Sequence, residues 1–205
     1  MQDTLITIFS LIILLFSVII HELAHGFVAE ALGDPTAKYA GRLTLNPIKH
    51  IDLFGSIILP LVLFITGAPF LVGWAKPVPV NPYNFRDQKW GSLKVAIAGP
   101  LSNFSLAVIF GLVVRFSGLP FGAPIIQFFI IIVLTNLMLG LFNLIPVPPL
   151  DGHWILFTFI PDRLFVVKSF LQRYGFYILL ALLFFNALDF LSVATEYLFR
   201  IIVGI

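Results

Sequence analysis

Two histidines and a glutamate lie within five residues of each other near the end of the first apolar stretch, in the pattern His-Glu-x-x-His. His21 and His25 are four residues apart, so on a helix with 3.6 residues per turn both imidazoles face the same side and can reach one Zn²⁺. Glu22 lies beside them, where its carboxylate can accept a proton from an attacking water molecule. The alternative is that these residues only meet water at a helix end. In so apolar a helix, nothing but a function would offset their desolvation.

A catalytic zinc ion needs a third protein ligand and an open position for water. Asp151 is the strongest candidate, because it follows an apolar stretch and a Pro-rich break that lets the backbone aim a carboxylate back into the membrane. The alternative, that Asp151 only caps a helix starting at Gly152, fits the residues equally well. His153 is a weaker candidate, because its i+2 spacing at a helix start points it elsewhere.

Four further polar residues do not belong to the proposed ligand set. His50 and Asp52 are close enough in sequence to line its mouth or assist substrate binding, although such a pair is more often simply solvated. Glu30 and Asp34, at the end of the first apolar helix, are expected to face water.

The composition restricts the environment in which this chemistry takes place. Of the 205 residues 60% are hydrophobic and 11% are charged, against roughly 25% charged in soluble domains. A net charge of +2 excludes binding of nucleic acid through phosphates, and the absence of cysteine excludes thiolate nucleophiles and Cys-based zinc sites. We therefore expect one integral membrane domain over residues 1–205, in which each polar residue inside an apolar stretch needs an explanation.

Apolar stretches of about 20 residues, the length that spans a bilayer, position these residues. They cover 4–31, 53–72, 95–117, 124–145 and 176–202. The first lacks a cationic leader and a small-residue cleavage site, so we interpret it as a retained helix. The stretch 53–72 contains Pro60, Gly67 and Pro69, so it is either a kinked span or a re-entrant element. The Pro-rich segment 73–82 is predicted to be strand-like or irregular.

Three motifs together resemble the site-2 protease family of intramembrane zinc metalloproteases. They are the His-Glu-x-x-His pattern, the Ala-Gly-Pro-Leu-Ser-Asn sequence of residues 98–103, and the segment 143–152, which ends in Leu-Asp-Gly. They occur in the family's order over nearly the whole chain. The chain is similar to the compact branch, which lacks PDZ and cystathionine-synthase-type (CBS) domains.

The resemblance implies an all-α membrane protein, a polytopic helical bundle with a three-helix catalytic core and one Zn²⁺ per chain. It implies these residue roles: His21, His25 and Asp151 as metal ligands, Glu22 as the catalytic base, and Asn103 and Asn143 near substrate or the oxyanion. Substrates would be transmembrane proteins or peptides, cleaved in or near their membrane segments.

The membrane topology follows from the need for the ligands to meet at one depth. His21 lies roughly 25 Å along a helix that starts at residue 4, near the far end of the first span. Asn103 and Asp151 lie on the same side of the membrane as His21 only if 53–72 is re-entrant. Arg115 and Arg200 then lie on one side and ten cations lie on the other. Those ten are Lys38, Arg42, Lys49, Lys76, Arg86, Lys89, Lys94, Arg163, Lys168 and Arg173. By the positive-inside rule, the site lies near the cytoplasmic face, with a short β-like element there, four crossings and both termini outside.

A second reading is a transporter or metal-ion carrier that uses intramembrane His, Glu and Asp. It predicts polar residues spread through the membrane depth and often an inverted repeat, whereas these cluster at one depth without a visible repeat. An inactive scaffold is a third reading, which the presence of all four polar groups does not favour. The sequence leaves homo-oligomer formation open.

Overall fold

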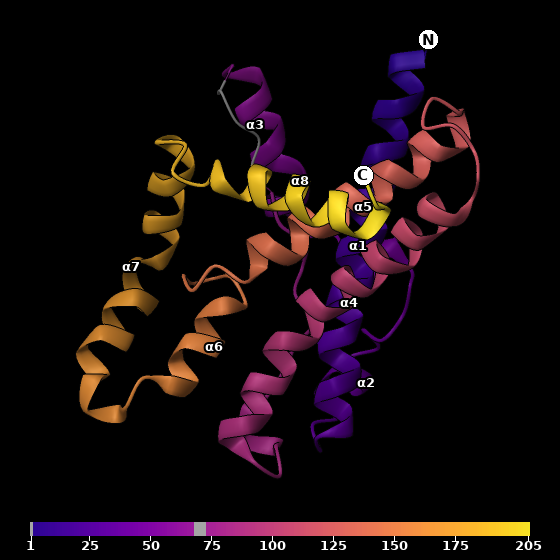
Figure 1. Cartoon of the computed structure of the whole chain (residues 1–205). Helices are drawn as coiled ribbons and strands as arrows, with labels where there is room; N and C mark the ends of the chain where they lie inside the picture. The colour runs from indigo at the N-terminus through magenta and orange to yellow at the C-terminus, as the bar shows by residue number, and fades with distance from the viewer. Residues whose placement is uncertain (1, 68–72) are drawn as a thin grey trace.

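The computed structural model describes residues 2–67 and 73–205, and these residues are mostly helical (Figure 1). The α-helices are α1 (Gln2–Ala31), α2 (Thr36–Tyr39), α3 (Leu59–Ile65), α4 (Gln88–Phe116), α5 (Pro124–Asn143), α6 (Gly152–Phe159), α7 (Phe165–Phe184) and α8 (Phe190–Val203). A π-helix (Leu53–Ile58) precedes α3, and short 3-10 helices cover Pro47–Lys49, Pro82–Asn84 and Asp162–Leu164.

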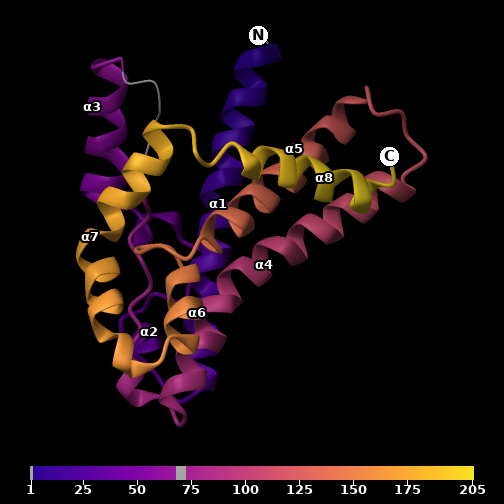
Figure 2. The ribbon, with the colours of Figure 1, turned by 60° about the vertical axis from the view of Figure 1, so that its left-hand side comes forward.

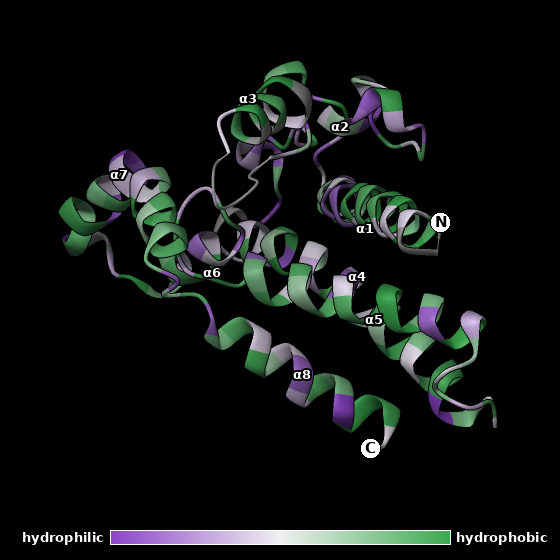
Figure 3. Ribbon diagram, turned by 90° about the horizontal axis from the view of Figure 1, so that it is seen from above, coloured by the Kyte–Doolittle hydropathy of each residue, from purple (hydrophilic) through white to green (hydrophobic). Residues whose placement is uncertain are grey.

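Four of these helices are long and apolar enough to cross a membrane. Their candidate spans are Thr4–Ala31, Trp90–Phe116, Pro124–Asn143 and Phe165–Phe184. Large apolar side chains on their outer surfaces are exposed, for example Leu11 at 60% and Ile109 at 57%. Figure 3 shows apolar residues around most of these helices. A multi-pass membrane protein is therefore confirmed.

Helices α1, α4 and α5 pack against one another and form the centre of the molecule (Figure 2). Ala107 of α4 and Val133 and Leu137 of α5 are almost completely buried where these two helices meet α8. The α5–α6 connection is covered by α7 and α8, since Ile145 and Leu150 share a buried cluster with Leu179 and Leu191. The predicted all-helical bundle is thus confirmed, with α1, α4 and α5 in mutual contact and the α5–α6 connection packed beside α7 and α8.

The C-terminal stretch differs from the prediction of one span over residues 176–202. The spanning helix lies earlier, as α7, and the chain turns before α8. Asn186 has a left-handed backbone with φ 54°, a conformation that Asn adopts more readily than most residues and that ends helices. Helix α8, with 14 residues, is too short to span a bilayer and packs across α4 and α5.

The stretch 53–72 is also shorter as a helix than its apolar length suggests. The π-helix and α3 contain six and seven residues, which is about 20 Å of helix and too little for a full crossing. Residues 68–72 lie outside the described part. Beyond them, Trp74 N donates to Gly55 O at 3.2 Å and Lys76 N to His50 O at 2.8 Å. Residues 74 and 76 therefore lie beside residues 55 and 50.

The predicted short β-like element is not supported, because none of residues 2–67 and 73–205 is assigned to a strand. Residues 73–81 are extended but have little to offer a partner strand. Pro77 and Pro79 lack an N–H, and the N–H groups of Val78 and Asn81 donate to carboxylates of other segments. This segment is fixed by side chains instead of by a β-ladder.

Candidate active site

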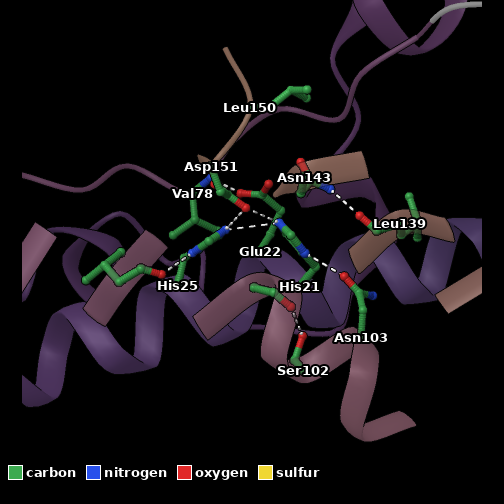
Figure 4. Close-up of polar contacts among 12 residues, drawn as sticks. His21, Glu22, His25, Val78, Ser102, Asn103, Leu139, Asn143, Leu150 and Asp151 are labelled. Carbon is green, nitrogen blue, oxygen red and sulfur yellow. Dashed lines mark hydrogen bonds and ion pairs between the residues drawn. The ribbon is translucent and has the colours of Figure 1, made fainter. Parts of the chain in front are cut away.

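The side chains of His21, His25 and Asp151 converge on one another (Figure 4). The two Nε2 atoms lie 3.0 Å apart. Asp151 Oδ2 lies 2.9 Å from His21 Nε2 and 3.2 Å from His25 Nε2. Both histidines are buried. The structure therefore brings together three potential ligand atoms from α1 and the α5–α6 connection, which are far apart in the sequence.

Hydrogen bonds on the far side of each ring fix which nitrogen faces the cluster. His25 Nδ1 lies 2.7 Å from the carbonyl oxygen of Val95, and His21 Nδ1 lies 2.7 Å from Asn103 Oδ1. A carbonyl oxygen only accepts, so each neutral ring carries its proton on Nδ1 and presents an Nε2 lone pair to the other ring. This is the arrangement in which histidine binds metal ions.

Such a cluster fits a cation. Two nitrogen lone pairs and a carboxylate oxygen repel one another at these distances unless positive charge lies among them. Asp151 Oδ2 is buried without a hydrogen-bond partner, which is costly for a charged group. Two imidazoles and one carboxylate are also a zinc ligand set found in hydrolases. His21, His25 and Asp151 therefore form a group that could hold a metal ion such as Zn²⁺.

Gly99 of α4 forms the wall beside this cluster. A Cβ atom at this position would lie 2.5 Å from Nε2 of both His21 and His25. Only a residue without a side chain lets α4 approach the imidazoles so closely. The glycine of the sequence motif 98–103 thus shapes the space around the ligand atoms.

Asp151 occupies the N-cap position of α6 but does not act as a cap. Its side chain makes no capping hydrogen bond, so the alternative that it serves only as a helix cap is wrong. Gly152 follows because a Cβ there would lie 2.2 Å from Leu144 O. The close contact of Gly152 with the end of α5 brings the Asp151 carboxylate back toward α1.

Glu22 is anchored by the extended segment. Its Oε2 accepts a hydrogen bond of 2.7 Å from the backbone N–H of Val78 (Figure 4). Arg42, which is buried, donates from Nη2 to the carbonyl oxygen of Lys76 at 2.7 Å. These contacts hold residues 76–78 against the helix that carries the two histidines and fix one oxygen of the Glu22 carboxylate.

Asp34 fixes the other end of the same segment, contrary to the expectation that it faces water. It is 0% exposed, accepts from Asn81 N at 2.7 Å and Asn84 Nδ2 at 2.8 Å, and is also bonded to Thr36. Burial alone would raise the pKa of Asp34, but the hydrogen bonds from Thr36, Asn81 and Asn84 outweigh it and lower the pKa below its ordinary value. Glu30, by contrast, pairs with exposed Lys38 at 2.6 Å.

The remaining predicted residues have different positions. His153 is buried with Nδ1 2.6 Å from Leu150 O and is not part of the metal-binding group. His50 is not solvated, as such a residue usually is. It is 1% exposed, and its Nε2 lies 2.8 Å from the carbonyl oxygen of Thr44. Asp52 caps the π-helix through Gly55 N.

Asn103 and Asn143 separate in the structure. Asn103 contacts His21, whereas Asn143 donates from Nδ2 to Leu139 O of its own helix at 3.0 Å. The sequence reasoning missed Ser17 and Asn136, which are buried and hydrogen-bonded to each other. Their signal was available, since both are polar residues within apolar stretches.

Comparison with known proteins gives an independent view of the chain. The model of peptidase family M50 matches residues 9–123 and 120–185. "Putative zinc metalloprotease YwhC" of Bacillus subtilis (strain 168) is 43% identical over 178 residues, which cover 83% of this chain and 78% of that protein. "Putative zinc metalloprotease Rip2" of Mycolicibacterium smegmatis is 30% identical over 85% of this chain and 66% of its own length. "Zinc metalloprotease MJ0392" of Methanocaldococcus jannaschii is 31% identical over 78% of this chain and 37% of its own length. No solved structure matches the chain.

Proposed function

This chain belongs to peptidase family M50 and is an intramembrane zinc metalloprotease; from that premise we propose that it hydrolyses peptide bonds in or near transmembrane segments of other membrane proteins. The observation that carries the assignment of the site is the convergence of His21, His25 and Asp151 within 4.8 Å. We propose these three residues as the zinc ligands and Glu22 as the catalytic base.

Bound zinc would supply a Lewis acid that lowers the pKa of water toward about 7 and polarises the scissile carbonyl. The chain's own residues then position and move protons. The Val78 N–H holds Glu22 Oε2, which leaves Oε1 to accept a proton from the attacking water. Glu22 delivers this proton to the nitrogen of the leaving amine. A carboxylate with one anchored oxygen keeps the same position for both transfers.

We propose that Asn103 orients His21 and does not stabilise the oxyanion. Its Oδ1 is engaged by His21 Nδ1, and its Nδ2 donates to Asn136 Oδ1 at 2.9 Å. We assign it to orienting His21. We propose Asn143 as a residue that contacts substrate, because it ends α5 and the Pro-rich connection that follows it carries Asp151.

We propose that residues 53–72 are re-entrant. The hydrogen bonds from Lys76 to His50 and from Trp74 to Gly55 support an entry and an exit on the same side. Arg115 donates to the carbonyl oxygen of Ile201, the residue after Arg200, at 3.4 Å. This contact supports a position of Arg115 and Arg200 on one side of the membrane, opposite the site. With this topology the site opens toward the cytoplasm and both termini lie outside. Single cysteines at positions 2 and 92 of this cysteine-free chain should be labelled from opposite sides; labelling from the same side contradicts the topology.

One paired experiment separates the protease from a metal carrier and from an inactive scaffold. Zinc content and cleavage of a transmembrane model substrate are measured for the wild type and for Asp151→Ala. A protease loses both zinc and cleavage in the variant. A carrier binds zinc without cleaving, and a scaffold does neither. Exposed Asp189, changed to Ala in the same way, is a matched control that should leave both unchanged.

A further inference from the structure

A chain of buried amides extends from the candidate site into the centre of the bundle. Asn103 of α4 and Asn136 of α5 are both 0% exposed. Asn103 Nδ2 donates to Asn136 Oδ1 at 2.9 Å, and Asn136 Nδ2 donates to Ser17 Oγ of α1 at 3.0 Å and to Ile132 O at 2.9 Å. Three helices therefore meet at a polar network inside an otherwise apolar core.

Two backbone carbonyls set the direction of the hydrogen bonds in this network: Ile132 O accepts from Asn136 Nδ2 at 2.9 Å, and Ser17 O accepts from Asn103 Nδ2 at 3.4 Å. Ile132 O can only accept, so the NH₂ group of Asn136 must face it and the Asn136 oxygen must face Asn103. The NH₂ group of Asn103 then faces Asn136, and its oxygen faces His21. An oxygen at that position requires His21 to carry its proton on Nδ1.

We propose that Asn136 is a positioning residue that sets the tautomer of His21 through Asn103. Ile132 O fixes the orientation of Asn136, and the bond from Asn103 Nδ2 to Asn136 Oδ1, at 2.9 Å, is shorter than its 3.4 Å contact with Ser17 O. As a result of this relay, His21 directs an Nε2 lone pair at the cluster. This inference rests on the proposed role of His21 as a zinc ligand. Asn136 itself belongs to neither the ligand set nor the proton transfer.

Interhelical contact alone does not explain the network. A single amide would join two helices, yet here both amides are oriented so that each NH₂ group donates and each amide oxygen accepts. Buried polar groups in a membrane are expensive and are retained mainly where they serve a function. Partners behind a metal-binding histidine typically change metal affinity about 10–100-fold.

The first test is ¹⁵N NMR of histidine in the zinc-free protein, which distinguishes the two neutral tautomers. The chain has four histidines, so substitution of the other three assigns His21. We expect the Nδ1–H form in the wild type and a mixture of tautomers in Asn136→Leu. An Nε2–H form in the wild type would overturn the proposal, whatever the variants do.

Zinc affinity, measured by competition with a chelator, is the second readout. Asn136→Leu should bind zinc about 10–100-fold more weakly, while KM at saturating zinc stays within about threefold of the wild type because substrate contacts are unchanged. Asn136→Asp should rescue affinity, because an oxygen still faces Asn103. Equal affinities for Asn136→Leu and the wild type would refute the relay.

Ser17→Ala separates the relay from a purely structural role. Ile132 O alone still orients Asn136, so this variant should keep the tautomer and the zinc affinity. Ser10→Ala is its matched control, because it removes a serine bond to Ile6 O on the same helix. A large loss of zinc affinity in Ser17→Ala alone would favour a structural network over the relay. If the wild type bound no zinc, the proposed function would fail instead, and the NMR result would still decide the tautomer.

Discussion

Gly99→Ala tests the geometry of the site without removing any polar group. The added methyl carbon would lie 2.5 Å from Nε2 of both His21 and His25. Ordinary contacts begin at about 3.4 Å, so one or both rings must move by about 0.9 Å, or α4 must shift away. Metal–ligand distances tolerate only about 0.2 Å, so the displaced rings cannot keep good ligand positions.

The expected effect on the reaction is large. A misplacement of about 1 Å at a reacting centre can cost about 100-fold in rate, so kcat/KM for a transmembrane model substrate should fall by about that factor. Zinc should also be removed more readily by a chelator. Both quantities are measured on protein purified in detergent, with circular dichroism to show that the helices remain folded.

Gly122→Ala provides the matched control. A Cβ at Gly122 meets no atom within 4 Å, so the same chemical change there should leave zinc affinity and cleavage unaltered. A folded Gly99→Ala protein that binds zinc and cleaves as the wild type does would refute the proposed position of α4 against the imidazoles.

Three further predictions concern groups around the site. Replacing the Val78 amide by an ester removes the N–H that donates to Glu22. This change should lower kcat by about tenfold with little change in KM, since general-base catalysis contributes about 10²–10⁴ in rate. Val78→Ala keeps the N–H and should leave kcat unchanged. Asp151→Asn should lose zinc while its helix content persists, as metal analysis and circular dichroism will show. The hydrogen bonds of Asp34 lower its pKa, so their stabilisation is present above an unfolded pKa of about 3.9 and is lost as the pH falls through the lower folded value. The thermal unfolding temperature of Asp34→Asn should therefore fall less on acidification than that of the wild type. An identical fall in both proteins would contradict this role of Asp34.

The long helices could be predicted from the sequence because their apolar runs match the bilayer thickness. The His21 and His25 pair could be predicted because a spacing of four residues has one geometric meaning on a helix. Asp151 was open to two interpretations, since a helix cap and a metal ligand need the same residue type at the same position. The structure excludes the capping hydrogen bond and places the carboxylate against His21, and the role of Asp151 as a zinc ligand stays a proposal.

Other features depend on contacts that no local pattern specifies. Burial of Asp34 and the anchoring of Glu22 by Val78 arise when the extended segment folds back against α1. The span predicted over 176–202 was misplaced, because apolar content continues past Asn186, whose left-handed backbone separates α7 from α8. Pairing of Asn136 with Asn103 requires two helices to be placed in register. Such long-range contacts supply the precision of the site.

The central claim is tested most directly by the rate at which reconstituted protein cleaves a transmembrane model substrate, compared between wild type and Glu22→Gln with equal zinc loading. The wild type should cleave within or near the membrane segment. Glu22→Gln, which keeps the proposed ligands, should retain zinc and lose cleavage. Undiminished cleavage by the zinc-loaded variant would contradict the role of Glu22 and the account built on it.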